Sequence, residues 1–338
     1  MKAAVLIKPL KFQIIEIEQP EPGPFEVRIK VKAAGICGTD LEAYKGNSPK
    51  GWTIQYPFQM GHELSGVVDK LGTEVQGFKI GDHVVPDGRL VCGRCINCHK
   101  GHFNACLNAG YTSGGFKEYS VYPFQNLVKI PNGVSFEEAA LTEPLSCCIY
   151  GTSQLNIPLG CNAVVIGDGP IGLLHAQILR SRGAKTTIIG ITKERLEVAK
   201  GLGFDSIINA ENQDMVEEVK HITGGYGADI VISAVGNEKV LEDALIISAR
   251  KGQVLYFAAV MKDKIQLDLD LVHYKELRLI GSYDSTLANY RDALKLMFLN
   301  QIDVKPLITH SFYLTDIKQA FEAAHSQQGM KIVIKNEC

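Results

Sequence analysis

The stretch Ala163-Val164-Val165-Ile166-Gly167-Asp168-Gly169-Pro170-Ile171-Gly172 decides the fold of the second half of this chain. An apolar run leads into a G-x-G-x-x-G turn and then into a helical pattern, which is the context that a dinucleotide-binding turn requires. Gly167 permits the tight turn, Gly169 lets the backbone approach a pyrophosphate, and Gly172 allows the helix to pack closely on the strand. The free N–H groups of the helix that Pro170 and Ile171 open would then bind the anion. A glycine-rich turn without a ligand is the alternative.

Apolar runs of four to six residues alternate with helical stretches from Ala163 onward. This alternation predicts βαβ units and a parallel sheet, so the predicted fold class is α/β. Strands are predicted at 163–167, 186–190, 206–209, 230–234, 254–257, 277–282 and 329–335, and helices at 170–182, 194–202, 215–222, 239–249 and 288–299. The first half is rich in strands, predicted at 12–18, 27–33, 64–71 and 83–86, with a Pro/Gly turn at 20–24.

Four cysteines form a C-x2-C-x2-C-x7-C cluster, namely Cys92, Cys95, Cys98 and Cys106. Zn²⁺ favours four thiolates in a closed tetrahedron, so the cluster predicts a structural zinc. Disulfides and an iron–sulfur cluster are the alternatives, but disulfides need an oxidising compartment and the last gap does not fit a ferredoxin. His99 and His102 could replace a thiolate, but with four cysteines present we expect them to be solvated loop residues. The remaining cysteines that we considered, Cys147, Cys148, Cys161 and Cys338, are expected to pack or to be incidental.

Length and composition set limits on the rest. A chain of 338 residues suggests two domains, and 46% hydrophobic with 21% charged residues is ordinary for a globular protein. The net charge of -2 implies no polyanion, so no nucleic-acid partner is expected. We find no signal peptide and no apolar stretch that could span a membrane, and nine thiols suit a reducing compartment, so we expect a cytoplasmic protein without a membrane partner.

The second strand of the parallel sheet bears on the choice between NAD(H) and NADP(H). A site for NAD usually has an acidic residue there, but Gly190 occupies that position. A missing carboxylate leaves room for a 2′-phosphate, which Thr192, Lys193 and Arg195 could bind. The sequence therefore favours NADP(H), with NAD(H) also usable. The alternative is that these cations begin a solvated helix and that Glu194 binds the ribose.

A second metal site is suggested by Cys37 and His62, a soft and a borderline zinc ligand. A catalytic zinc has three protein ligands and one open position, and either Glu63 or Glu143 could complete the set. Each of these residues has an ordinary structural explanation when taken alone. Spacing alone does not show that they meet in space.

The chain resembles the zinc-dependent medium-chain dehydrogenases. The resemblance rests on Gly61-His62-Glu63-x-x-Gly66 with Gly72 and Val75, on the four-cysteine lobe, and on the turn at 167–172, in the same order along nearly the whole chain. Within that family, Thr142-Glu143-Pro144-Leu145 resembles the branch of the sorbitol and polyol-phosphate dehydrogenases. The segments Gly190-Ile191-Thr192-Lys193 and Thr223-Gly224-Gly225-Tyr226-Gly227-Ala228 resemble pentitol-phosphate dehydrogenases.

The resemblance implies a GroES-like catalytic domain formed by 1–150 and 286–338, with a zinc lobe at 92–106, and a Rossmann domain at 151–285. It implies an active site in a cleft between the domains. It also implies that Cys37, His62 and Glu63 hold the catalytic zinc, with Glu143 binding directly or through water. Thr39 would take the hydroxyl proton while hydride passes to the nicotinamide. Thr39 could also cap the following helix.

The substrate is less constrained by the sequence. Sorbitol dehydrogenases carry an arginine and often a histidine at two positions where this chain has Asp284 and Glu42. Both differences make the site less cationic, which disfavours a phosphorylated substrate and favours a neutral polyol, a cyclitol or an amino alcohol. Asp284 could instead point to solvent.

Three functions follow from these motifs. The first is an NADP(H)-preferring polyol or sugar-alcohol dehydrogenase with one catalytic and one structural zinc. The second is a related dehydrogenase acting on threonine or a simple secondary alcohol. The third, a nucleotide-binding protein without catalysis, conflicts with the complete metal set. The resemblance also implies a homodimer or homotetramer, joined through an edge of the Rossmann sheet at 255–260 and 277–281.

Overall fold

The structure, a computed structural model, describes residues 1–48, 53–112, 114–258 and 264–336. The chain divides into two compact units. Unit 1 comprises Met1–Pro144, Thr286–Phe298 and Leu307–Cys338, and unit 2 comprises Leu145–Ser285 and Leu299–Pro306. The domains predicted from sequence place 145–150 and 299–306 in the other unit; the predicted boundary at 150 and the boundary after Pro144 both fall within α4 (Thr142–Ser153). Cys338 lies outside the described residues.

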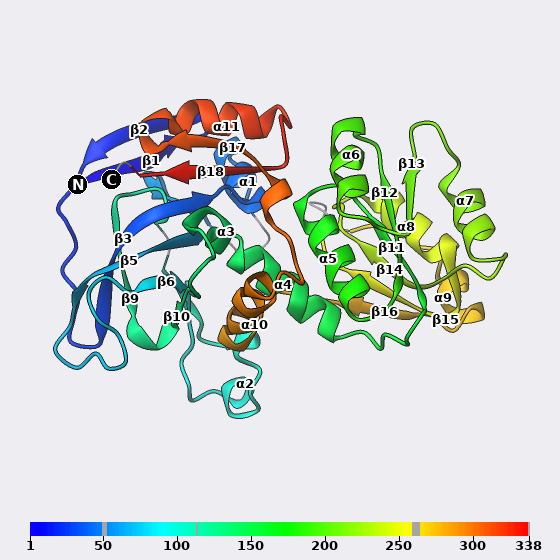
Figure 1. The fold of residues 1–338 in the computed structure, drawn as a ribbon, viewed down its shortest axis with the longest axis horizontal. Helices are drawn as coiled ribbons and strands as arrows, with labels where there is room; N and C mark the ends of the chain where they lie inside the picture. Colours follow the sequence, from blue (N-terminus) through cyan, green and yellow to red (C-terminus); the bar gives the residue numbers. More distant parts are fainter. Residues whose placement is uncertain (49–52, 113, 259–263, 337–338) are drawn as a thin grey trace. The chain divides into compact units, whose positions relative to one another are not determined.

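Unit 2 contains a six-stranded parallel sheet with the strand order β13-β12-β11-β14-β15-β16 (Figure 1). The two halves of this order run outward from a central strand, which is the doubly wound arrangement of the Rossmann domain that the resemblance implies. Its strands are β11 (Asn162–Ile166), β12 (Lys185–Gly190), β13 (Ser206–Asn209), β14 (Ala228–Ser233), β15 (Ser248–Tyr256) and β16 (Arg278–Gly281). Its helices are α5 (Pro170–Ser181), α6 (Lys193–Gly201), α7 (Met215–Ile222), α8 (Glu238–Ile247) and α9 (Leu269–Tyr274), together with most of α4.

The sequence placed the end of one helix and the start of one strand in unit 2 incorrectly. Helix α8 ends at Ile247, not at 249, and β15 begins at Ser248, well before 254. The pairing of β15 with β14 shifts register, and Lys251 within the shift has a φ of 62°. This irregularity interrupts the apolar alternation, so periodicity detected only the regular end of the strand. Strand β15 lies between β14 and β16, so of the two expected edge segments β16 is the one at the edge; residues 259–260 lie outside the described part.

Unit 1 is built from antiparallel strands, with one parallel pair between β17 and β18. Its larger sheet has the order β10-β6-β5-β3-β18-β17, with β9 also paired to β3, and a smaller sheet has the order β2-β1-β4. The strands are β1 (Lys2–Lys8), β2 (Lys11–Glu16), β3 (Glu26–Gly35), β4 (Phe58–Gln59), β5 (Glu63–Leu71), β6 (His83–Pro86), β7 (Arg89–Leu90), β8 (Gly110–Tyr111), β9 (Tyr119–Pro123), β10 (Leu127–Lys129), β17 (Ile308–Tyr313) and β18 (Lys331–Lys335).

The helices of unit 1 are α1 (Gly38–Lys45), α2 (Ile96–His99), α3 (Phe136–Ala140), the start of α4, α10 (Leu287–Phe298) and α11 (Ile317–His325), with 3-10 turns at Phe103–Ala105, Phe124–Asn126 and Leu314–Asp316; a further 3-10 turn, Lys305–Leu307, crosses from unit 2. The strongly amphipathic α11 lies beside β2 and β17 in Figure 1 and packs Phe321 into the core. Phe12 and Tyr44 meet Phe321 there, with ring centroids 4.6 and 5.2 Å from it. Segments from both ends of the sequence therefore share one core.

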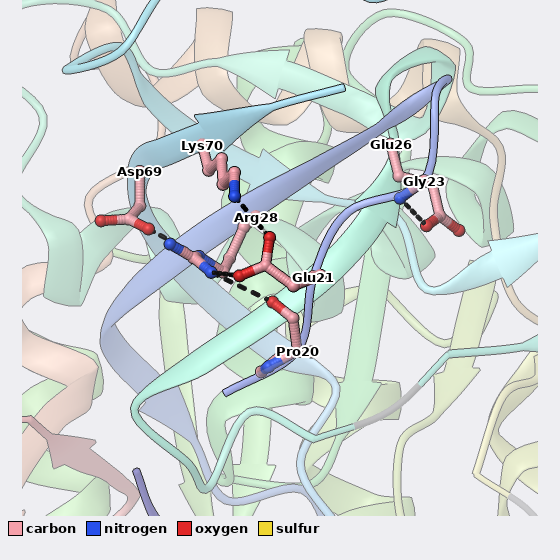
Figure 2. A network of polar contacts seen from close by, with 7 residues as sticks. All are labelled: Pro20, Glu21, Gly23, Glu26, Arg28, Asp69 and Lys70. Carbon is pink, nitrogen blue, oxygen red and sulfur yellow. Dashed lines mark hydrogen bonds and ion pairs between the residues drawn. The ribbon is translucent and has the colours of Figure 1, made fainter. Parts of the chain in front are cut away.

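Arg28 on β3 fixes the Pro/Gly turn that the sequence predicts at 20–24 (Figure 2). Its Nε donates to Asp69 Oδ2 at 2.6 Å, and its Nη1 donates to Glu21 Oε1 at 2.9 Å and to the Pro20 carbonyl at 3.3 Å. The Lys70 ammonium also pairs with Glu21, so the turn is tied to two neighbouring strands. This polar network links the turn to β3 and β5, and the residues of the candidate site lie at or next to the opposite end of that pair, where Gly35 faces Glu63.

Candidate active site and metal centres

The pairing of β3 with β5 brings the predicted ligands of the catalytic metal together. Gly35 at the end of β3 is opposite Glu63 at the start of β5. Cys37 follows β3 and precedes α1, and His62 immediately precedes β5. The ligand atoms of Cys37, His62 and Glu63 all lie within 4.8 Å of one another. One thiolate, one imidazole and one carboxylate form a donor set that suits a zinc ion with an open position.

Asp40 supports this set, a role that the sequence analysis did not assign. The buried Asp40 carboxylate accepts hydrogen bonds from the backbone N–H of Cys37 at 3.0 Å and of Gly61 at 3.3 Å. Its Oδ1 lies 3.7 Å from His62 Nδ1. Burial lowers the pKa of His62, but Asp40 and Cys37 outweigh burial and raise that pKa well above its usual value. Burial raises the pKa of Asp40 itself. A carboxylate behind a ligand histidine fixes the ring and increases its basicity.

Glu63 has a buried partner, Lys331 of β18. Lys331 Nζ donates to Glu63 Oε1 at 2.6 Å and to the Ile36 carbonyl at 3.0 Å, and both side chains of the pair are almost wholly buried. Burial lowers the pKa of Lys331, but Glu63 and Cys37 outweigh it and raise that pKa above its usual value. Gly35 makes room for the pair, because a Cβ there would overlap Glu63 and meet Lys331 Cε at 3.0 Å. No local sequence signal links residues 63 and 331.

Glu143, the other predicted ligand, lies in the first turn of α4. Its carboxylate interacts electrostatically with His62, with Lys331 and with the buried Asp87. Burial, against the effect of Arg89, raises the pKa of Asp87 to about 6. Glu143 is therefore near the metal set, but the group whose atoms lie within 4.8 Å contains Glu63 and not Glu143.

Thr39 is exposed in the first turn of α1, next to Cys37. It does not cap the helix: Cys37 is the N-cap residue, and Asp40 closes the cap from within the helix. The Thr39 hydroxyl is thus not needed for capping. Glu42, on the same helix, accepts from Lys45 Nζ at 2.9 Å and from Asn47 Nδ2 at 2.7 Å, and these bonds lower its pKa.

The four predicted structural ligands also form a group with sulfur atoms within 4.8 Å of one another, namely Cys92, Cys95, Cys98 and Cys106. Cys95 Sγ lies 3.5 Å from Cys98 Sγ and 4.0 Å from Cys106 Sγ. Tetrahedral zinc with Zn–S bonds of about 2.3 Å requires about 3.8 Å between sulfurs, so the cluster fits the ion. Backbone N–H groups, first that of Arg94, lower the pKa of Cys92 to about 6, which favours the ligating thiolate. His99 and His102 are exposed and lie outside this group.

The glycine turn in unit 2 has the local geometry of a dinucleotide site. Gly167 has a φ of 131°, which disfavours any side chain. A Cβ on Gly172 would overlap the Gly167 carbonyl, whereas a Cβ on Gly169 would meet nothing within 4 Å. Pro170 and Ile171 open the 12-residue helix α5, whose N-cap Gly169 offers no side-chain hydrogen bond. Open space beside unpaired helix donors fits a pyrophosphate.

The space beside Gly190 is taken by Asp168, the second residue of the turn. A Cβ on Gly190 would lie 2.5 Å from Asp168 Oδ2. Thr192 is the N-cap residue of α6, Lys193 and Glu194 are exposed, and Arg195 is partly buried beside Asp168.

The backbone of Asp284 has a φ of 59°, and its carboxylate accepts from the N–H of Ser285 at 2.6 Å.

Two family models match the chain. The model described as "Alcohol dehydrogenase GroES-like domain" matches residues 23–132, and the one described as "Zinc-binding dehydrogenase" matches 170–298. A sorbitol dehydrogenase of Halalkalibacterium halodurans is 33% identical over 330 residues, which cover 96% of this chain and 95% of the relative. This chain belongs to the zinc-dependent medium-chain dehydrogenases. The predicted fold class, α/β with a GroES-like part and a Rossmann part, is confirmed.

The dehydrogenase is also similar to proteins with other names. An L-threonine 3-dehydrogenase of Pyrococcus horikoshii is 34% identical over 330 residues, with 95% of this chain and 94% of the relative covered. A solved Sinorhizobium meliloti structure bound to NADP is 26% identical with a TM-score of 0.92, covering 99% of this chain and 98% of that one. These likenesses support an NAD(P)-dependent alcohol or polyol dehydrogenase of the sorbitol branch. In the described ranges, every helix is too short or too polar to cross a membrane.

Proposed function

We propose that this dehydrogenase oxidises a secondary hydroxyl of a neutral polyol or sugar alcohol to a ketone, and catalyses the reverse reduction. The observation that carries the proposal is the convergence of Cys37, His62 and Glu63 within 4.8 Å in acidic surroundings. A three-ligand set of this kind leaves the fourth coordination position for the substrate oxygen.

The residues of unit 1 take separate roles in this proposal. Cys37 and His62 would hold the ion with Glu63 or Glu143 as the third ligand, and Asp40 would orient Cys37 and His62. A zinc ion bound there supplies Lewis acidity toward an alcohol or carbonyl oxygen. Thr39, exposed beside Cys37, would accept the hydroxyl proton of the substrate and pass it onward, and a bound nicotinamide would supply the hydride acceptor. The cysteines at 92–106 hold a second, structural zinc.

The charges around the metal set favour a neutral substrate. Four carboxylates, those of Asp40, Glu63, Asp87 and Glu143, interact with the set or with one another, and the cation Lys331 is paired with Glu63. A phosphate group is usually recognised by Arg or Lys and would be repelled by these carboxylates. The same conclusion was drawn from Glu42 and Asp284, two acidic residues that stand where sorbitol dehydrogenases have basic ones. A phosphorylated polyol is therefore the less favoured member of the class.

L-Threonine is the second candidate substrate, because a relative with that activity in its name is as similar as the sorbitol dehydrogenase. The amino group of threonine is cationic and would suit acidic surroundings, while its carboxylate would require a cation. Lys331 cannot serve, since it is buried and already bound to Glu63. The structure therefore offers more support for a neutral polyol.

The cofactor is a nicotinamide dinucleotide bound at the turn 167–172. The NADP(H) preference expected from Gly190, Thr192, Lys193 and Arg195 stays a prediction. A relative of the same fold that is bound to NADP agrees with it, whereas the carboxylate of Asp168, which lies beside Gly190, opposes it.

Initial rates test the proposal. Purified enzyme with two zinc ions per chain is given NADP or NAD with neutral pentitols, hexitols and inositols, with their phosphates, with threonine and with simple secondary alcohols. Turnover of a neutral polyol at the highest kcat/KM is expected, and turnover of threonine alone would favour the second candidate. Thr39→Val should lower kcat by at least about 100-fold. The control Thr73→Val, an exposed threonine in unit 1, should be unchanged. Equal activity of both variants would contradict the role of Thr39.

A further inference from the structure

Asp168 ties the first βα turn of unit 2 to the second. Its Oδ2 accepts hydrogen bonds from the backbone N–H of Ile191 at 2.9 Å and of Thr192 at 2.7 Å. Both donors lie at the start of α6, where Thr192 is the N-cap residue without a capping side chain of its own. The side chain of Asp168 is only 8% exposed. These two N–H groups are thus already bonded to an anion that belongs to the chain.

The same carboxylate lies where dinucleotide folds usually have an acidic residue. That residue normally stands at the end of the second strand and binds the ribose hydroxyls. Here the second strand, β12, ends in Gly190, and a Cβ on Gly190 would lie 2.5 Å from both Cβ and Oδ2 of Asp168. The charge that is missing at 190 is therefore supplied by the turn that follows β11. No side chain at 190 and Asp168 could occupy the space together.

Arg195 faces this carboxylate and not open solvent. Its Nη1 lies 3.8 Å from Asp168 Oδ1, and its side chain is 20% exposed. From sequence, Thr192, Lys193 and Arg195 were predicted to bind a 2′-phosphate. In the structure, the backbone N–H of Thr192 and the guanidinium of Arg195 are both directed at Asp168. A distance of 3.8 Å is too long for a hydrogen bond, so Oδ1 retains capacity to accept one from a hydroxyl.

We propose that Asp168 determines cofactor choice, by accepting a hydrogen bond from the adenosine-ribose 2′-hydroxyl and repelling a 2′-phosphate. The enzyme would then prefer NAD(H), in contrast to the preference predicted from Gly190. This inference rests on the proposed function only in assuming that a nicotinamide dinucleotide binds at the turn 167–172. It assigns specificity to a position inside the glycine turn.

Binding of two cofactor fragments tests the proposal without catalysis. Isothermal titration calorimetry compares 5′-AMP with 2′,5′-ADP on the wild type and on Asp168→Asn, in which the amide oxygen can still accept from both backbone donors. The wild type should bind 5′-AMP more tightly. In Asp168→Asn the ratio of the two dissociation constants should shift toward 2′,5′-ADP by at least about tenfold.

The matched control is Asp205→Asn. Asp205 Oδ2 accepts from the backbone N–H of Thr186 at 2.7 Å, at the opposite end of the same strand β12. In Asp205→Asn, the ratio of the dissociation constants for 5′-AMP and 2′,5′-ADP should equal that of the wild type. Arg195→Gln alone should change the affinity for 2′,5′-ADP less than about twofold. Combined with Asp168→Asn, it should lower that affinity at least about fivefold, because no carboxylate at 168 then competes with the phosphate for the guanidinium.

Several outcomes would overturn the inference. A ratio unchanged by Asp168→Asn would do so, as would a wild type that already prefers 2′,5′-ADP. If Asp168→Asn does not fold, Arg195→Gln alone decides, because a loss above about tenfold in the wild type would show that Arg195 already binds the phosphate. If the wild type binds neither fragment but turns over a polyol with NAD, this inference fails while the proposed function stands. If it binds both fragments and turns over no alcohol, the proposed function fails instead.

Discussion

At the scale of single residues, the candidate metal site depends on charges that are buried beside its ligands. Asp40 lies behind Cys37 and His62, and Lys331 neutralises Glu63. A buried charge without a partner is costly, and a ligand without a fixed orientation binds metal weakly. These two supporting residues can be tested separately, one by stability and the other by metal affinity.

Replacing Lys331 with methionine should destabilise unit 1. The substitution leaves the Glu63 carboxylate buried at 1% exposure without its cation, so we expect a loss of about 3–5 kcal/mol in the free energy of unfolding. Urea unfolding of the metal-free protein measures it. The matched control is Lys318→Met, because Lys318 forms an exposed pair with Glu322 and should cost less than about 1 kcal/mol. Equal losses in the two variants would show that the buried pair does not contribute as argued.

Replacing Asp40 with asparagine should weaken the catalytic metal site while leaving the fold intact. The amide can still accept from the Cys37 N–H, but it carries no charge toward His62. We expect about 10–100-fold lower affinity for one of the two zinc ions, measured by competition with a chelator. Glu42→Gln on the same helix, whose carboxylate bonds Lys45 and Asn47, is the control and should retain both ions. Unchanged affinity in Asp40→Asn would contradict the orienting role.

At the scale of elements, two local assemblies are held by different forces. The lobe at 92–106 has short elements, the four-residue α2 and a 3-10 turn at Phe103–Ala105, and little buried apolar surface. Such a segment needs a metal to order it. In unit 2, α4 and α5 pack through buried side chains that include a histidine.

Loss of one lobe ligand should remove the structural zinc. In Cys98→Ser the four-thiolate set is incomplete, so metal analysis should give one zinc per chain instead of two. Cys161→Ser is the control, since Cys161 is a buried cysteine of unit 2 outside both ligand groups, and it should retain two. Two zinc ions in Cys98→Ser would exclude this lobe as a zinc site.

His175 of α5 should make the protein sensitive to acid. It is fully buried, its Nδ1 lies 2.9 Å from Thr152 Oγ1 of α4, and burial lowers its pKa to about 3. The unfolded chain binds a proton below about pH 6.5 and the folded chain does not, so stability is full above pH 6.5 and falls as the pH drops toward 3. His175→Phe should reduce the slope of unfolding free energy against pH by up to about 1.4 kcal/mol per pH unit between 4 and 6.

Urea unfolding at several pH values measures that slope. The control is His221→Phe, on α7 of the same unit, because His221 is exposed and should leave the slope unchanged. An identical slope in the wild type and His175→Phe would show that His175 titrates in the folded protein as it does in the unfolded chain.

At the scale of the whole molecule, the parallel sheet of unit 2 ends in an edge strand. Strand β16 pairs with β15 on one side, and Leu279 in it is 43% exposed. An edge strand with an exposed apolar residue can pair with a second chain. The predicted dimer or tetramer would use this edge.

Leu279→Asp should therefore dissociate the oligomer, since a two-fold axis brings the two new carboxylates together. Sedimentation velocity should show monomers for this variant. Leu159→Asp is the control, because Leu159 is 89% exposed in the same unit but lies outside the strands, and it should sediment as the wild type. Equal sedimentation of both variants would place the interface elsewhere.

Sequence alone determined the elements and motifs whose signal is local. The strand–turn–helix at 163–182, the helix Met215–Ile222, the strands His83–Pro86 and Ser206–Asn209 and the cysteine spacing follow from periodicity and ligand chemistry within a few residues. Short strands such as β4, β7 and β8 were not predicted, because two residues show no period. The identity of the ligand set was suggested by residue types, but not its convergence.

Tertiary structure decided which charges meet. Lys331 reaches Glu63 because β18 pairs with β3 and β3 pairs with β5, a relation between residues 268 positions apart. Asp168 reaches the end of β12 because parallel strands bring their βα turns to the same edge of the sheet. From sequence, Gly190 indicated that the carboxylate at the end of the second strand is absent. In the fold, the carboxylate of Asp168 lies beside Gly190. Electrostatic specificity depends on distance in space, and only packing sets that distance.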